Sequence, residues 1–427
     1  MYLLFFLIFG IILGAMANYA AASWAWSPKR NHPWCRSDHH RPFWWKIPVI
    51  GWLGMRREAD QFGRGFWIRP LCVELGMGIF AAWFFQTQVV GLLILVTQNR
   101  IPVTNTFIWS ILARCAFQLV FIGLMLGASL IDFDEKTIPD HILIGGTLFA
   151  LITAFITPYT ICETEYGTEQ ILPVNQLLDF PLSRVETSED LLFPLTAAAP
   201  NPPLDVCRSG KGGRWGLISA LLCWWGWCFA LMERHWRMNR GFFWAWRIFW
   251  ERLRRTRSTR QLWSLLKWGT LAILFLWATA WPQWLSVWST LLGMGVAGGF
   301  MWILRLAAQF SMDREALGFG DVLLMAMFGA FLGWQPCVVL FFIAPFAGLF
   351  LAVPRLIFLH DLETPFGPFL CLAALITMLF GPYFWNLTLP VFRFGPHLIT
   401  LGLGLLLLMV ILLTLIRWVE KLLGFEY

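Results

Sequence analysis

The chain has 427 residues, of which 58% are hydrophobic and only 13% are charged, and its formal net charge is +7. A soluble domain typically has about 25% charged residues, so this composition excludes a soluble globule. It also excludes disordered, coiled-coil, collagen-like and disulfide-scaffold proteins. The sequence therefore predicts an all-α, polytopic integral membrane protein.

Apolar stretches that could cross a bilayer recur along the whole chain. A spanning helix needs about 20 predominantly apolar residues. In chain order the candidates are 2–22, 72–96, 107–131, 141–159, 215–232, 267–282, 286–307, 322–335, 337–353, 366–384 and 397–417. The stretch 320–353 fits one helix or two, so we expect about 9–11 transmembrane helices.

The segments between these stretches differ in charge, which predicts the topology. Residues 23–69 carry nine Lys and Arg against three acidic residues, and residues 233–266 carry nine Arg against two. Residues 159–214 carry eight acidic and four basic residues. Because short basic loops stay cytoplasmic, we expect the first two segments inside, the irregular 159–214 segment outside and the N-terminus outside. The basic, aromatic stretch 233–260 is expected to lie on anionic lipid rather than on nucleic acid.

Two acidic clusters lie at predicted membrane boundaries on the cytoplasmic side. Asp132 directly follows one apolar stretch, and Asp321 opens another. An ionisable residue at the end of a membrane helix is a functional-site hypothesis by default. The two aspartates are 189 residues apart, so only the fold can bring them together.

Two facing carboxyl groups would share a proton, because like charges cannot both ionise cheaply. The neutral group could then act as a general acid while the ionised group activates water, as in an aspartic protease. Gly318 and Gly320 would allow a close approach of backbone to a substrate strand. Pro139 would end the preceding helix. The simpler alternative is that these acids are ordinary interfacial carboxylates.

Several motifs, in the same order, resemble the prepilin peptidases, which form the type IV leader peptidase family of bacterial intramembrane aspartyl proteases. Asp132 with Ile138-Pro139-Asp140 resembles the first aspartate motif of the family, and Gly318-Phe319-Gly320-Asp321 resembles the second. The run 364–370 and the segments 14–18, 47–52 and 69–74 are similar to further family motifs. The likeness covers about 15–155 and 310–383.

The resemblance implies a membrane-embedded aspartic endopeptidase of the bacterial inner membrane, acting on the leader peptides of type IV prepilins or pseudopilins. Asp132 and Asp321 would be catalytic. The supporting residues would be Gly318, Gly320, Asp134, Pro139 and Asp140, with Asp140 as a helix cap in the simpler interpretation. Partners would be these substrates and the lipid bilayer, without nucleic acid, and proteolysis would need no cofactor.

The chain also departs from the family pattern. Family members usually carry two C-x-x-C pairs resembling a zinc site in the first cytoplasmic loop, whereas Cys35 stands alone here. We therefore expect no zinc, the alternative being a makeshift site from His32, Cys35, Asp38, His39 or Glu58. Many members also N-methylate the new amino terminus with S-adenosylmethionine. That activity is linked to the N-terminal part that diverges here, so it stays open.

These comparisons divide the chain into four parts. We expect residues 1–96 to form an N-terminal helix pair with the basic loop. The peptidase core would consist of 107–159 and 310–384. Residues 160–309 would be an insertion, and 397–427 an extra C-terminal helix. Two other functions remain open. The same carboxylates could serve an ion- or proton-coupled transporter, or the chain could be a catalytically inactive assembly factor.

Overall fold

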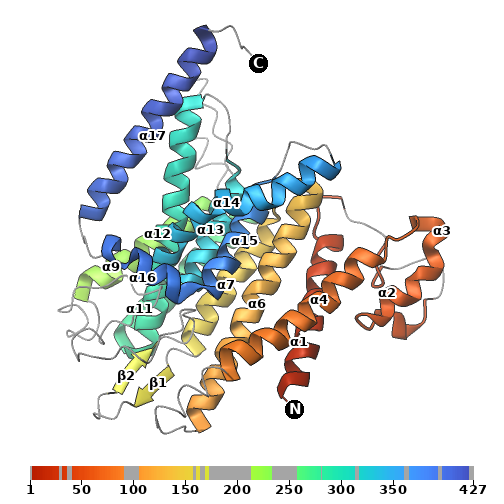
Figure 1. Cartoon of the computed structure of the whole chain (residues 1–427). Coiled ribbons are helices and arrows are strands. Elements are labelled where there is room, and N and C mark those ends of the chain that lie inside the picture. Colours follow the sequence, from red (N-terminus) through yellow and green to blue (C-terminus); the bar gives the residue numbers. More distant parts are fainter. Residues whose placement is uncertain are drawn as a thin grey trace.

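The computed structural model describes residues 2–27, 31–35, 41–90, 105–156, 160–163, 169–172, 213–232, 257–279, 281–312, 317–359, 365–392 and 397–422. These residues form a bundle of long helices with a smaller lobe at one side (Figure 1). Asp38, His39 and most of the predicted lipid-facing segment 233–260 lie outside the described residues.

The bundle is made of helices that follow the apolar stretches of the sequence. They are α1 (Tyr2–Ser23), α4 (Ile68–Phe85) with η3 (Gln86–Val90), α6 (Asn105–Glu135), α7 (Asp140–Ile156), α9 (Gly213–Ala230), α11 (Arg257–Thr279), α12 (Trp281–Met312), α13 (Phe319–Leu332), α14 (Trp334–Leu359), α15 (Gly367–Leu379), α16 (Gly381–Phe392) and α17 (His397–Leu422). In the described part of the chain, five helical segments are long and apolar enough to cross a membrane, and shorter apolar helices accompany them. The predicted all-α, polytopic class is confirmed, while the number of spans stays a prediction.

The structure decides one alternative that the sequence left open and differs from the prediction at two places. The stretch 320–353, for which one helix or two was expected, is two helices, because Gly333 adopts a φ of 87° that ends α13. The stretch 366–384 is divided at Phe380 into α15 and α16. The segment expected to be wholly irregular contains a short antiparallel pair, β1 (Thr160–Glu163) and β2 (Glu169–Leu172).

Aromatic stacking fixes α6 against α13, the two helices that carry the candidate aspartates. The ring of Phe121 on α6 stacks on Phe331 of α13 with centroids 4.4 Å apart, and Phe117 lies 5.0 Å from the same ring. On its other side α13 packs along α12, where a Cβ at Gly329 would collide with the backbone of Gly293. These contacts leave α13 little freedom to shift relative to α6.

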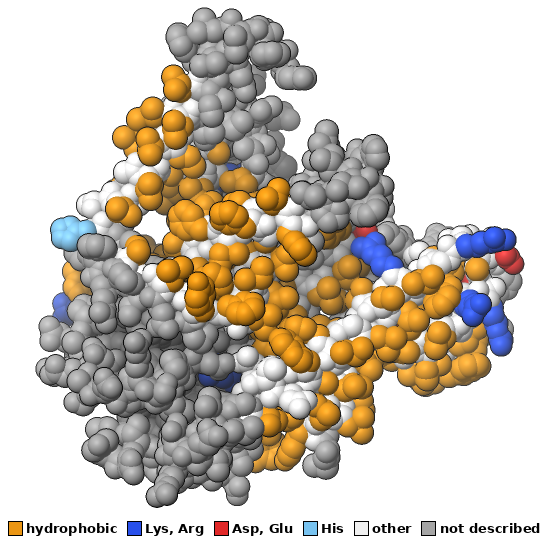
Figure 2. Space-filling view, in the orientation of Figure 1, with side chains coloured by type: hydrophobic (Ala, Val, Ile, Leu, Met, Phe, Trp, Pro, Cys, Tyr) orange, Lys and Arg blue, Asp and Glu red, His pale blue; other side chains and the backbone are white. Residues whose placement is uncertain are grey.

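The surface of the bundle is apolar over much of the face seen in Figure 2, and Lys and Arg side chains gather over the smaller lobe. Arg56, Arg57 and Arg64 are exposed there. An apolar flank beside a basic end is the pattern expected of helices in lipid with a basic loop at the membrane surface.

The lobe consists of η1 (Phe43–Lys46), α2 (Ile50–Met55), η2 (Arg56–Glu58) and α3 (Ala59–Phe62), and we call it the aromatic lobe. Its core is Trp45, Trp52 and Met55, which are 8%, 3% and 0% exposed. Trp34 and Trp67 are among the partly buried residues that pack on this core. Burial of aromatic side chains therefore supplies most of the core of this lobe.

A buried carboxylate ties the aromatic lobe to the helices. Glu74 on α4 is fully buried and accepts hydrogen bonds from the Trp52 Nε1 atom at 2.7 Å and the Asn18 Nδ2 atom of α1 at 3.2 Å. The backbone amide of Val49, which has a φ of 66°, donates to the same side chain. Asn18, Trp52 and Glu74 belong to the three N-terminal motifs of the sequence, so those motifs meet at one point.

An ion pair closes the part of the lobe that contains Cys35. The Arg41 guanidinium binds both carboxylate oxygens of Glu58, at 3.0 and 2.6 Å, and also donates to the carbonyl oxygen of His32 at 2.9 Å. Both side chains of the pair are largely buried. Burial first, and then the charge of Arg41, lowers the pKa of His32, so this imidazole stays neutral beside the guanidinium.

Replacing Arg41 with Leu is expected to destabilise the aromatic lobe by about 3–5 kcal/mol, because it leaves the Glu58 carboxylate buried without its partner. Thermal unfolding in detergent, combined with limited proteolysis of the lobe, measures the effect. The matched variant Arg64→Leu removes an exposed Arg of the same lobe and is expected to change stability by less than about 0.5 kcal/mol. Equal stability of the two variants would contradict a structural role for the ion pair.

Candidate active site

Asp132 lies on the last turn of α6, at the end of an apolar run. The helix ends because Lys136 turns to a φ of 56°, with its amide bonded to the Asp132 carbonyl oxygen at 2.9 Å. The side chain of Asp132 is 4% exposed. A carboxyl group this deep at a membrane boundary needs polar partners to offset the loss of water.

Asp321 lies on the first turn of α13 and is 8% exposed. Its carboxylate accepts a hydrogen bond from the backbone amide of Gly318, the N-cap residue of the same helix. This is the reciprocal half of a capping box, in which the third helical residue reaches back to the N-cap amide. The short Gly-x-Gly-Asp motif is therefore a helix start that holds its own carboxylate in place.

The fold brings the two aspartates together, as the sequence predicts. Their carboxyl groups lie close enough for the two charges to repel each other directly. A third element completes the site, because the amide of Gly367 at the start of α15 donates to the Asp132 carboxylate. Helices α6, α13 and α15 thus meet at one pair of carboxyl groups, 189 residues apart in the chain.

Ile138 lies between the glycines of this site. Its side chain is 3.5 Å from the position that a Cβ on Gly320 would take, and a Cβ on Gly367 would lie 2.9 Å from its Cδ1 atom. A Cβ on Gly367 would also collide with the Asp132 Oδ2 atom. The absence of a side chain at Gly367 is therefore what allows α15 to approach the carboxyl pair, whereas a Cβ on Gly320 would only be in ordinary contact with Ile138.

Cys371 and Ser129 lie beside the carboxyl pair and were not predicted from the sequence. Cys371, one turn after Gly367 on α15, is 6% exposed and lies near both aspartates. Its thiol is hydrogen-bonded to the side chain of Ser129, which is one turn before Asp132 on α6. Spacing along each helix from Asp132 and from Gly367 is the signal that could have found them.

Arg305 is a third residue that the sequence analysis did not single out. It stands on α12 inside an apolar run, donates from its Nε atom to the carbonyl oxygen of Leu317 at 3.0 Å, and places its guanidinium 5.4 Å from the centre of the Phe319 ring. Its charge also acts on Asp321. A lone cation in a membrane helix is the signal that identifies such a residue. We infer that Arg305 positions the turn that carries Asp321.

Replacing Arg305 with Leu is expected to lower any activity of the aspartate pair by about tenfold, because the start of α13 loses both an anchor and a nearby positive charge. Arg305→Lys keeps the charge but cannot reproduce the planar Nε donor, so it should restore only part of the loss. Steady-state rates of substrate cleavage measure both variants. Full activity of Arg305→Leu would contradict the positioning role.

The remaining predicted supporting residues lie away from the pair. The Asp134 carboxylate points to Arg69 of α4, with an N–O distance of 2.7 Å, and its side chain is 21% exposed. Asp140 is exposed in the first turn of α7. Pro139 lies in the turn between α6 and α7. Their supporting roles stay predictions.

Metal ligands do not cluster in the described part of the chain, where no three His, Cys, Asp or Glu side chains could hold one ion. The expected absence of zinc stays a prediction. In the aromatic lobe, Glu58, one of the residues of the alternative makeshift site, is paired with the Arg41 guanidinium.

Fold and site together define an α-helical, multi-pass membrane protein with two buried carboxyl groups at the ends of neighbouring helices. Residues 258–353 match the model of the type IV leader peptidase family, a range that contains Asp321. The resemblance to this family is thereby confirmed. The match starts at α11 and includes α12, both of which lie in the part of the chain predicted to be an insertion.

Relatives of this chain are also named as leader peptidases. The chain is 30% identical over 102 residues to a prepilin leader peptidase/N-methyltransferase of Aeromonas hydrophila, covering 22% of this chain and 35% of the relative. It is 33% identical over 96 residues to the protein of that name in Legionella pneumophila, covering 21% and 32%. It is 30% identical over 125 residues to the protein of that name in Burkholderia pseudomallei strain 1026b, which covers 28% of this chain and 40% of the relative. The chain thus spans about a third of the length of the relatives it matches. No solved structure matches it.

Proposed function

We propose that this chain is a membrane-embedded aspartic endopeptidase that removes the leader peptides of type IV prepilins or pseudopilins. The observation that carries the proposal is the pairing of Asp132 and Asp321, two buried carboxyl groups supplied by the adjoining ends of α6 and α13. The match to the family model and the names of the relatives support the same activity.

The pair can hydrolyse a peptide bond with one shared proton. The ionised carboxyl group takes a proton from a water molecule, whose oxygen attacks the carbonyl carbon, while the protonated carboxyl group donates its proton to the carbonyl oxygen. Collapse of the tetrahedral intermediate breaks the C–N bond, and a proton passes to the leaving amine. The amides of Gly318 and Gly367 hold the carboxyl groups in place, so the reacting geometry is set before the substrate arrives.

The site would lie at the cytoplasmic face of the bacterial inner membrane. Both aspartates are at the same side of the bundle as the basic aromatic lobe, since Arg69 at the start of α4 pairs with Asp134 near the end of α6. Basic loops stay cytoplasmic, which would leave the N-terminus outside. Cleavage would then fall at the cytoplasmic end of the apolar segment of the substrate.

N-methylation of the new amino terminus is a second proposed activity, supported by the printed names of the relatives. S-adenosylmethionine would supply the methyl group. In the family, this activity is linked to the N-terminal cytoplasmic region, which corresponds to the aromatic lobe. In this chain the centre of the lobe is filled by Trp45, Trp52 and Met55. We therefore assign no residue to the methyl donor.

Co-expression of the full chain with a prepilin-like protein from the same genome tests the proposal. Mass spectrometry of the substrate's amino terminus is expected to show loss of the leader, and the same spectrum shows whether the new terminus carries a methyl group. An intact leader on every pilin-like protein of that genome would overturn the peptidase function and would favour an assembly or transport role for the same carboxylates.

A further inference from the structure

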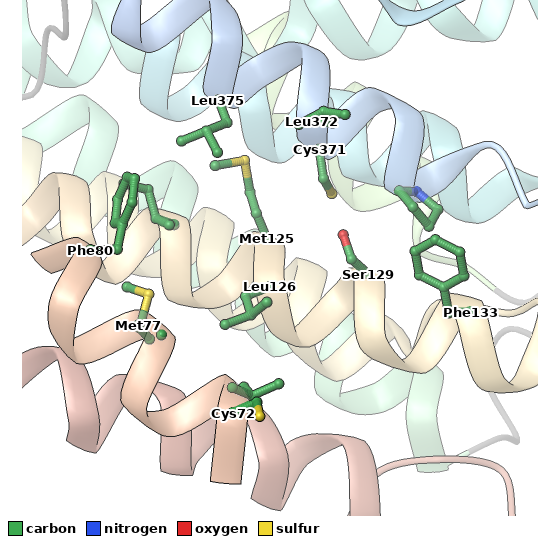
Figure 3. A pocket seen from close by; sticks show the side chains of 14 residues that line it. Cys72, Met77, Phe80, Met125, Leu126, Ser129, Phe133, Cys371, Leu372 and Leu375 are labelled. Atoms are coloured by element: carbon green, nitrogen blue, oxygen red, sulfur yellow. The ribbon is translucent and has the colours of Figure 1, made fainter. Parts of the chain in front are cut away.

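An apolar groove lies between three helices of the bundle, next to the candidate active site. It lies between α4, α6 and α15 and has a volume of about 390 Å³. Figure 3 shows the side chains of these three helices converging on it, with Met77 and Phe80 from α4, Met125 from α6 and Leu375 from α15. None of the described residues that line it is charged. We call it the α4–α6–α15 groove.

One end of the groove is lined by close neighbours of the two aspartates. Ser129 and Phe133, which line it, are respectively one turn before Asp132 and the next residue after it. Pro368 and Cys371 line it from α15, directly after Gly367 and one turn farther along. The hydrogen-bonded Ser129 and Cys371 side chains therefore form the boundary between the apolar groove and the carboxyl pair.

The wall of the groove on α4 contains two small residues among larger ones. Cys72 and Gly76 are exposed and one turn apart, and a Cβ on Gly76 would have no atom within 4 Å. Gly76 is thus not needed for packing within the chain. Small residues on a membrane helix allow a second helix to approach its backbone closely.

The dimensions fit a short length of helix. From Cys72 to Phe80 the groove follows α4 for about 12 Å, and from Pro368 to Leu375 it follows α15 for about 10 Å, at a rise of about 1.5 Å per residue. That length accommodates about two turns of a helix. An apolar chain of a lipid would also find the surface favourable, but it offers no peptide bond to the carboxyl groups at the end of the groove.

We propose that the α4–α6–α15 groove binds the apolar transmembrane helix of the substrate, with the peptide bonds just beyond that helix lying at Asp132 and Asp321. This inference rests on the proposed function and adds the place where the substrate docks. The groove holds the last two turns of the helix, and Gly76 leaves room for its backbone. The choice of substrate then depends on the presence of an apolar helix next to the cleaved peptide bond.

Cross-linking from Cys72 tests the docking without depending on catalysis. The full chain with Asp321→Asn is co-expressed with a prepilin-like substrate that carries single cysteines at successive positions of its apolar segment, and the membranes are oxidised. We expect disulfides from Cys72 to substrate positions three or four residues apart, the period of a helix lying in the groove. Cys72→Ser should abolish them.

A matched pair of glycine variants links the cross-link to the groove. Gly76→Phe fills the groove and is expected to lower the cross-link yield by about tenfold or more, which corresponds to about 1.4 kcal/mol of binding. Gly145→Phe places the same side chain on the exposed face of α7, where a Cβ also has no neighbour within 4 Å, and should leave the yield unchanged.

The outcomes separate the docking site from the proposed function. Substrate that is cleaved by the unmodified chain but never cross-links to Cys72 would overturn the groove and leave the peptidase function standing. Periodic cross-links to a substrate that the unmodified chain does not cleave would support the groove and overturn the function. Labelling of Cys72 by a photoreactive lipid, without any substrate cross-link, would show that lipid is the occupant and would overturn the inference.

Discussion

Replacing either Asp132 or Asp321 with Asn is expected to lower the rate of leader cleavage by about 100- to 10,000-fold, the range that general acid–base catalysis contributes. Asn is nearly isosteric with Asp and can keep the amide hydrogen bonds of Gly367 or Gly318, so the helices should still meet. It cannot carry the shared proton. Mass spectrometry of the substrate's amino terminus over time measures the rate of each variant.

Two control variants show whether the loss belongs to the pair. Asp60→Asn, on the exposed surface of α3, is expected to cleave at the unmodified rate. Asp134→Asn weakens an ion pair with the exposed Arg69, which is worth about 1 kcal/mol or less, so its rate should fall by less than about fivefold. Normal processing by a folded Asp132→Asn or Asp321→Asn variant would contradict the assignment of the catalytic pair.

The methyl group of a Gly367→Ala variant is expected to lower cleavage by about 100-fold, because a displacement of about 1 Å in a reacting group can have that effect. The new carbon would overlap the Asp132 Oδ2 atom and press on Ile138. Since Asp132 is held by the end of α6 on one side and by α15 on the other, its carboxyl group must turn away from Asp321.

Gly299→Ala on α12 is the matched control for this variant. A Cβ on Gly299 has no atom within 4 Å, so the change should leave cleavage unaffected and, as a glycine-to-alanine change within a helix, stabilise the protein by about 1 kcal/mol or less. Thermal unfolding of both variants in detergent separates a displaced carboxyl group from a misfolded bundle. Gly367→Ala that cleaves at the unmodified rate would contradict the geometry of the site.

The course of most helices could be predicted from the sequence, because a lipid-exposed apolar run has few conformations other than a helix. The predicted boundaries of α1 and α7 differ from the observed ones by a few residues. The residues at which an apolar stretch is divided into two helices were harder to predict. Nothing in the hydropathy of 320–353 distinguishes one bent helix from two, and the break depends on the backbone of Gly333.

The aspartates could be predicted because a carboxylate next to an apolar run is rare and costly. Their neighbours could not. Gly367 contributes a backbone amide and an empty space, and Cys371 resembles the other buried thiols of the chain, so neither differs chemically from a structural residue. Only the crossing of α6 with α15 shows that they share a site. Arg305 did carry a signal, a charge inside an apolar helix, although its target on α13 depends on the fold.

The origin of the two carboxyl groups in separate halves of the chain also sets when the site can exist in the cell. Asp132 is synthesised 189 residues before Asp321. At about 5–20 residues per second, the ribosome adds the second aspartate on the order of 10–40 s after the first. Throughout that interval α6 is in the membrane without α13, so the emerging chain has no complete pair. The proposed activity would therefore begin only once the second half has been inserted.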